Sequence, residues 1–81
     1  ATLYEQLSAV GGELQNGRRN FGELEAAAKA SLQEAGFKVD YFAIRRALNL
    51  ETPDRDCDDL VVLAAAELGD ARLIDNIVVT V

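Results

Sequence analysis

The chain has 81 residues and a net charge of −6, from 14 acidic and 8 basic side chains. This excess of carboxylates argues against binding to nucleic acid or to anionic membranes, because proteins bind both of these partners with Lys and Arg placed near phosphates. The sequence has no histidine, which excludes Ser-His and Cys-His nucleophilic pairs and imidazole metal ligands. A chain of this length forms one domain, and its core is expected to be aliphatic, since 49% of the residues are apolar and only 6% aromatic.

A few sequence features bear on the cellular compartment of the protein and on whether the chain is a fragment. No apolar run approaches the roughly 20 residues of a membrane span, and no basic-then-apolar start resembles a signal peptide. The single cysteine, Cys57, cannot form an internal disulfide, so we expect a cytoplasmic protein. Because the chain starts at Ala1 and contains no methionine, we expect a fragment or a processed product.

The first predicted element is a helix over residues 1–15. Gly11 and Gly12 weaken it by about 1 kcal/mol each relative to alanine, so a neighbouring element must pack closely on them or the helix frays there. Asn16-Gly17 ends the helix, because both residues tolerate the left-handed conformation of a helix end. The apolar residues at helical spacing are Leu3, Leu7, Val10 and Leu14.

A second helix follows, with signals at both of its ends. Asn20 is a candidate N-cap, and Glu23 stands three residues later, at the return position of a capping box. Gly36 ends the helix, and Phe37 lies five positions beyond Leu32, the spacing of the hydrophobic contact in a Schellman motif. The apolar face consists of Phe21, Leu24, Ala28, Leu32 and Ala35.

The apolar period then changes to two, which predicts a first strand over residues 39–46. In a regular strand Val39 and Tyr41 face one side and Phe42 faces the other, so this strand is apolar on both faces near its middle. Its end is marked by Arg45-Arg46.

A loop is predicted over residues 49–59, which contain the only proline and a cluster of acidic side chains. A calcium loop starting at Asp54 needs Gly at its sixth position and Glu at its twelfth, but these positions hold Asp59 and Ala65. We therefore interpret the cluster as a solvated acidic loop. Cys57 within it is expected to be an inert thiol, because nearby carboxylates disfavour the thiolate.

Residues 60–68 are ambiguous, because their unbroken apolar character suits a buried strand whereas residues 64–67 suit a helix. Val61-Val62 favour a strand. Gly69-Asp70 can form a two-residue hairpin loop that leads into a third strand over residues 71–79. We therefore expect an α+β fold, with two helices packed on one face of a three-stranded antiparallel sheet.

Several charged or polar residues are candidate ligand contacts. The pairs Arg18-Arg19 and Arg45-Arg46 can meet an anionic ligand across a domain interface, but we interpret them as solvated or balanced by carboxylates. In the third strand, Arg72 and Asp75 face opposite sides unless a bulge intervenes, and we expect structural anchors rather than ligand contacts. Asn76 can form a bulge or a side-chain-to-backbone hydrogen bond.

Two stretches of the chain, Gly36–Arg46 and Leu63–Ile77, resemble the C-terminal domain of the pantothenate synthetase (pantoate–β-alanine ligase) family. The matching elements are Gly36-Phe37, Ile44-Arg45, Leu68-Gly69 and the run Arg72-Leu73-Ile74-Asp75-Asn76. The family joins pantoate to β-alanine: Mg-ATP first makes a pantoyl adenylate, and the amine of β-alanine then displaces AMP to give pantothenate. The resemblance implies that residues 1–81 are a single domain, the C-terminal lid that closes over the adenylate site of a longer ligase.

The resemblance also limits what this chain does alone. The family's histidines and its Ser/Arg-bearing loop belong upstream, in an N-terminal Rossmann-like domain, and cannot be placed here. The resemblance therefore implies that the full-length enzyme uses ATP and Mg²⁺ and that neither binds to this chain. We assign this chain no catalytic, cofactor-binding or metal-ligating residue, and we expect it to be inactive alone. The implied partner is the N-terminal domain, within a full-length homodimer.

Two other classes stay open: a free-standing acidic protein-interaction module, and an acidic regulatory subunit that mimics a polyanion. A lid predicts an exposed apolar patch where the N-terminal domain sits. A free-standing module predicts a surface that does not need to be covered by another domain.

Overall fold

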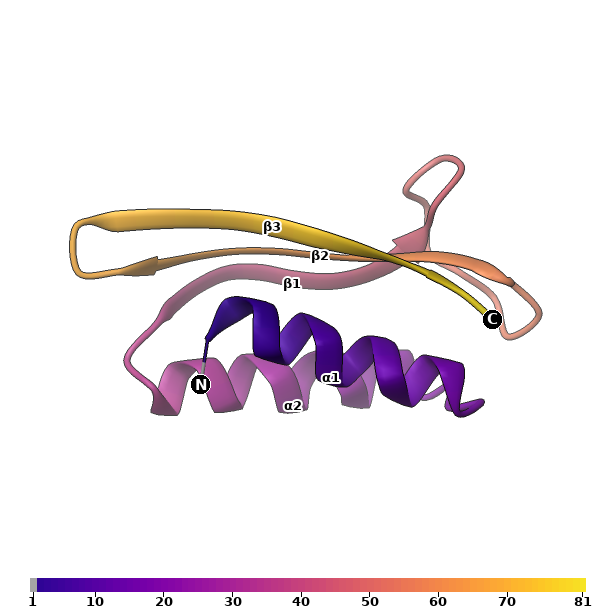
Figure 1. The fold of residues 1–81 in the computed structure, drawn as a ribbon, viewed down its shortest axis with the longest axis horizontal. Coiled ribbons are helices and arrows are strands. Elements are labelled where there is room, and N and C mark those ends of the chain that lie inside the picture. The colour runs from indigo at the N-terminus through magenta and orange to yellow at the C-terminus, as the bar shows by residue number, and fades with distance from the viewer. Residues whose placement is uncertain (1) are drawn as a thin grey trace.

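Two helices and then three strands follow one another along residues 2–81, the part of the chain that the computed structural model describes. Figure 1 shows both helices on one side of the sheet. The sheet is antiparallel, with strand order β1-β2-β3, so the predicted α+β architecture is confirmed. The elements are α1 (Leu3–Gln15), α2 (Phe21–Glu34), β1 (Lys38–Arg46), β2 (Asp59–Leu68) and β3 (Ala71–Thr80).

A capping box that the sequence analysis missed opens α1. The Thr2 hydroxyl accepts the Glu5 N–H at 3.1 Å, and the Glu5 carboxylate accepts the Thr2 N–H at 2.8 Å. The hydrogen bond from the Thr2 backbone is the largest cause of a lowered pKa of Glu5. The Thr-x-x-Glu spacing at residues 2–5 is the sequence signal for this motif.

Close packing on α1 is confirmed at Gly11 but not at Gly12. A Cβ atom at Gly11 would lie 2.8 Å from Ile77 Cδ1 and 3.3 Å from Val79 Cγ2, whereas a Cβ at Gly12 meets no described atom within 4 Å. Gly11 is therefore the point at which α1 approaches β3.

Helix α2 begins after Asn20 and ends before Gly36, as predicted, but the predicted capping box at its N-terminus is wrong. Asn20 occupies the N-cap position without a side-chain capping hydrogen bond, and its side-chain nitrogen donates to Glu23 Oε2 at 3.1 Å instead. Its backbone, at φ −81° and ψ 64°, departs from the extended conformation that aims a cap oxygen at the first amides. At the C-terminus, Phe37 N–H donates to the Leu32 carbonyl at 3.0 Å and Gly36 N–H to that of Gln33 at 3.0 Å, which is a Schellman motif.

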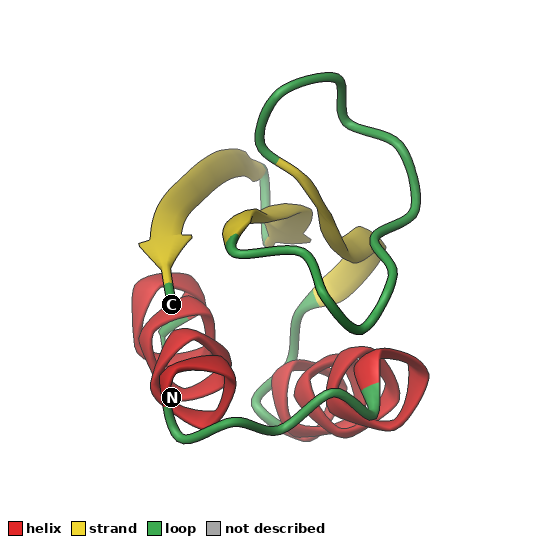
Figure 2. Cartoon of the chain, turned by 90° about the vertical axis from the view of Figure 1, so that its right-hand side faces the viewer, coloured by secondary structure: helices red, strands yellow, loops and turns green. Residues whose placement is uncertain are grey.

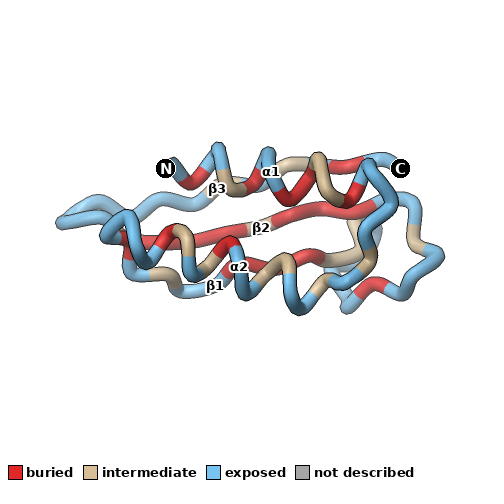
Figure 3. The backbone as a smooth tube through the Cα atoms, turned by 90° about the horizontal axis from the view of Figure 1, so that it is seen from below, coloured by how far each residue is buried: buried red, intermediate tan, exposed pale blue. Residues whose placement is uncertain are grey.

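Residues 60–68 form a strand, β2, which is the centre of the sheet and is buried along most of its length (Figure 3). The β2–β3 register runs without a break from Asp59 opposite Thr80 to Leu68 opposite Ala71. Gly69, with φ +60°, is the first residue of the two-residue hairpin loop, as predicted.

An irregularity in β1 changes which residues share a face. The β1–β2 register shifts between Val39 and Tyr41, which leaves Asp40 without a partner in the ladder. As a result Val39 packs against the core on the same side as Phe42, not on the side of Tyr41 as regular alternation predicted. The core lies between the helices and this side of the sheet. Its largest fully buried side chains are Leu7, Leu14, Leu32, Ile44, Leu60 and Val62.

Candidate functional site: the helix-free face of the sheet

The side of the sheet that faces away from the helices is apolar in its middle. Strand residues alternate between faces, so those that do not point to the core lie on this side. Three cross-strand rows follow from the register: Tyr41–Ala65–Ile74, Ala43–Leu63–Asn76 and Arg45–Val61–Val78. We call this surface the helix-free face, and its central residues are Tyr41, Ala43, Val61, Leu63, Ala65, Ile74, Asn76 and Val78.

Large side chains on this face are in contact with solvent. Ile74 is 66% exposed, Val78 68% and Tyr41 41%. Ala65 is fully buried, because it lies in the middle strand between the larger Tyr41 and Ile74. No described element covers the face (Figures 1 and 2). Contiguous exposed apolar patches of this kind mark interaction surfaces.

Charged side chains border the face at the hairpin end. Arg72 donates a hydrogen bond to Asp40 Oδ2, and its Nη1 lies 3.8 Å from Glu67 Oε1. The hydrogen bond that Arg72 donates to the Asp40 carboxylate is the main cause of its raised pKa. The bulge that removes Asp40 from the ladder thus supplies the partner of Arg72. An apolar centre with a polar rim is the usual composition of a protein interface.

The predicted anchors of β3 take separate positions. Because the register beside Ile74 is regular, Arg72 and Asp75 face opposite sides, and Arg72 pairs with the carboxylates on β1 and β2. Asp75 is half-buried, and its Oδ1 accepts the Asn76 N–H at 2.8 Å. Asn76 lies in a continuous ladder rather than at a bulge, opposite Leu63 on the helix-free face.

The basic pairs contact carboxylates and carbonyls. Arg45 lies 3.5 Å from Glu25, and Arg46 lies 3.9 Å from Asp54. At the other pair, Arg18 lies 3.4 Å from Glu13, while Arg19 Nη1 donates to the Leu14 carbonyl at 3.0 Å. These arginines therefore make local contacts within this chain and do not form a cluster that could bind an anion.

In the acidic loop, the Cys57 thiol is half-buried and donates to the Asp59 carbonyl at 3.3 Å. Within residues 2–81, no three Cys, Asp or Glu side chains are arranged to hold a metal ion. None of the helices within these residues has the length and apolar character needed to cross a membrane.

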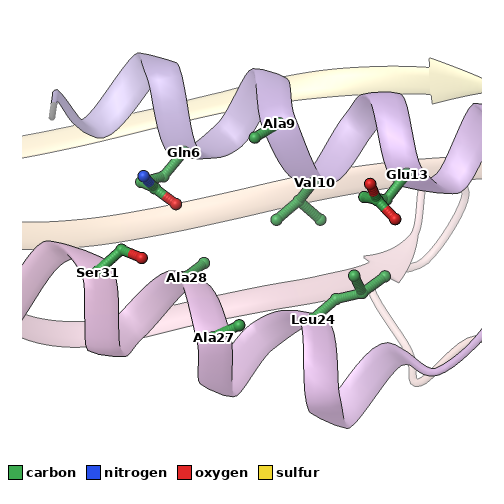
Figure 4. A pocket seen from close by; sticks show the side chains of 8 residues that line it. All are labelled: Gln6, Ala9, Val10, Glu13, Leu24, Ala27, Ala28 and Ser31. Carbon is green, nitrogen blue, oxygen red and sulfur yellow. The ribbon is translucent and has the colours of Figure 1, made fainter.

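A shallow groove of about 270 Å³ lies between the facing sides of α1 and α2 (Figure 4). Its polar side chains come from Gln6, Glu13 and Ser31, so it offers one carboxylate and no cation. A triphosphate needs cations or helix N-termini. The groove therefore does not have the composition of a nucleotide site. Its lining residues are Gln6, Ala9, Val10, Glu13, Leu24, Ala27, Ala28 and Ser31.

Comparison with known proteins gives the family. The sequence model of the family described as pantoate-beta-alanine ligase matches residues 1–78. This chain belongs to that family. It is 49% identical to the pantothenate synthetase of Thiobacillus denitrificans over 96% of this chain and 28% of that protein. It is 48% identical to the pantothenate synthetase of Idiomarina loihiensis over 99% of this chain and 28% of that protein.

A further relative, the pantothenate synthetase of Methylococcus capsulatus, is 41% identical over 96% of this chain and 27% of that protein. The chain thus spans little more than a quarter of the length of these curated pantoate–β-alanine ligase relatives. Most of each relative lies outside the region represented here.

An exposed apolar patch was predicted for a lid, but not its position on the fold. The signal lies in β3, where Leu73-Ile74 and Ile77-Val78-Val79 place apolar side chains on both faces of an edge strand. A strand of this kind needs cover on both faces, and the helices cover only one.

Proposed function

We propose that this chain is the C-terminal lid domain of a pantothenate synthetase and that its helix-free face docks over the active site formed by the rest of the enzyme. The observation that carries this proposal is the uncovered apolar centre of the sheet, with Ile74 and Val78 about two-thirds exposed. The family membership and the short span relative to the pantoate–β-alanine ligase relatives support it, because a large partner surface is expected in the same enzyme.

The proposed full-length enzyme condenses pantoate with β-alanine. The pantoate carboxylate attacks the α-phosphorus of ATP and displaces pyrophosphate; the amine of β-alanine then attacks the acyl carbon and displaces AMP. ATP and Mg²⁺ are assigned to the N-terminal Rossmann-like domain from the same family resemblance. From the family resemblance, we propose a cytoplasmic homodimer.

A lid contributes to this reaction by excluding water. A pantoyl adenylate is an activated acyl group, and attack by water would return pantoate and AMP and waste the ATP. Covering the site with an apolar sheet face removes that competing nucleophile and strengthens electrostatic interactions in the site. This role needs no catalytic side chain from the present chain.

The test uses the full-length enzyme in a Cys57→Ser background, with a single new cysteine at Val78. Its rate of reaction with a maleimide is compared in the free enzyme and with Mg-ATP plus pantoate, without β-alanine. The matched control is Ala30→Cys, at an exposed position on α2. The proposal expects slower labelling at position 78 on ligand binding and an unchanged rate at position 30. Equal rates at position 78 in both states would contradict closure by this face.

A further inference from the structure

The segment directly after β1 carries two exposed leucines that the lid proposal does not use. Leu48 is 88% exposed and Leu50 is 55% exposed. Figures 1 and 2 both show this segment rising from the end of β1 on the side of the sheet away from the helices. The leucines therefore stand beside one end of the helix-free face.

The loop holds these side chains in a defined conformation. Arg46 N–H donates to the Glu51 carbonyl at 2.8 Å, and Leu50 N–H donates back to the Arg46 carbonyl at 2.8 Å. The side chain of Asn49 accepts the Glu51 N–H at 3.1 Å. A loop closed by three hydrogen bonds presents its apolar side chains without further ordering, which lowers the entropic cost of binding.

Leu50 adopts a left-handed conformation, with φ +61°. This region is unfavourable for leucine and is common for glycine and asparagine. Neither exposure nor backbone geometry explains a leucine here, because both favour a small polar residue. Strained residues of this kind concentrate at binding and switch regions, so the conformation points to a contact made by the side chain.

We propose that Leu48 and Leu50 form a second docking contact with the remainder of the same enzyme chain, beside the helix-free face. This inference rests on the proposed function. The relatives are more than three times as long as this chain, so the enzyme contains a body large enough to span both surfaces. Because the loop rises on the side of the helix-free face, a body seated on that face meets the two leucines at its margin.

The surroundings of the loop indicate what the partner surface contains. A recess of about 310 Å³ adjoins Leu48, and its charged lining is acidic on balance, with three aspartates against one arginine: Asp56, Asp58, Asp59 and Arg46. Opposite charges across an interface steer docking and suppress wrong partners. The matching surface is therefore an apolar pocket for the leucines with Lys or Arg on the side that meets these carboxylates.

The experiment extends the labelling series on the full-length enzyme in the Cys57→Ser background. Leu48→Cys is labelled with a maleimide in the presence of Mg-ATP and pantoate, and its rate is divided by that of Ala30→Cys in the same state. If the contact forms, Leu48→Cys should react about tenfold or more slowly than Ala30→Cys in this state, because a covered thiol reacts only when the interface opens. The side chain is almost fully exposed, so this substitution leaves the fold of the domain intact.

Two outcomes separate this inference from the lid proposal. Protection at Val78→Cys with free labelling at Leu48→Cys overturns the loop contact and leaves the lid in place. Free labelling at both positions overturns the lid proposal and the loop contact together. As a second arm, Leu48→Ser is predicted to weaken the protection of Val78→Cys by ligands, and unchanged protection there counts against the contact.

Discussion

At the scale of single residues, Gly11 and Gly12 form a matched pair for the packing of α1 on β3. Gly11→Ala gains helix propensity but forces its methyl into Ile77 and the stiff, β-branched Val79, so we expect a net loss of about 1 kcal/mol of unfolding free energy. Gly12→Ala enters open space and should gain about 1 kcal/mol. Urea unfolding of the two variants measures both; stabilisation by both substitutions would refute the close approach at Gly11.

The capping box of α1 gives a pH-dependent prediction. The pKa of Glu5 is lowered from 4.5 in the folded chain, so its carboxylate adds stability above that pH and loses it as the pH falls through the folded value. Glu5→Gln keeps the shape of the side chain but has no charge to lose. The difference in melting temperature between wild type and Glu5→Gln should therefore shrink between pH 7 and pH 3. A constant difference would show that the charge at this cap does not contribute.

At the scale of elements, the free edge of β1 is protected by α2. Glu25 Oε2 accepts the Ile44 N–H at 2.8 Å, and Arg45 Nη1 donates to the Ile44 carbonyl at 2.9 Å. These side chains occupy the two backbone groups through which another strand would pair.

Removal of this protection has two expected consequences. Glu25→Ala should cost about 1 kcal/mol of stability, since a charge-assisted hydrogen bond is lost at a partly exposed site. It should also raise the fraction of dimer seen by sedimentation, because the Ile44 N–H becomes available to a second strand. Gln33→Ala, at an exposed position of the same helix, is the control and should change stability by less than about 0.5 kcal/mol. Equal effects of the two variants would contradict the protective role.

Local sequence signals predicted the helices and strands well, whereas contacts between residues far apart in the sequence were not predicted. The Schellman motif at Gly36 and the hairpin at Gly69 depend on a few adjacent residues, so their spacing was sufficient. The bulge at Asp40 depends on how β1 meets β2, and the partner of Arg72 lies 32 residues away. For the same reason the sequence implied an apolar patch but did not place it on the helix-free face.

At the scale of the whole molecule, the chain alone is predicted to form no pantothenate and to bind ATP weakly. The arginines discussed above contact neighbouring carboxylates and carbonyls, and the groove between the helices has no cation. Calorimetric titration of the 81-residue chain with Mg-ATP should therefore give no micromolar affinity. A micromolar dissociation constant would assign a nucleotide contact to this domain and would change its proposed role.

The most direct test of the central claim, that the helix-free face closes the active site, is the amount of AMP formed per pantothenate by the full-length enzyme. Ile74→Lys places a charge on the exposed centre of the face, and Ala30→Lys places the same charge on an exposed position of α2. We predict a ratio near that of wild type for Ala30→Lys and a clearly higher ratio for Ile74→Lys, because water then hydrolyses the uncovered adenylate. A wild-type ratio and wild-type turnover in Ile74→Lys would contradict the claim.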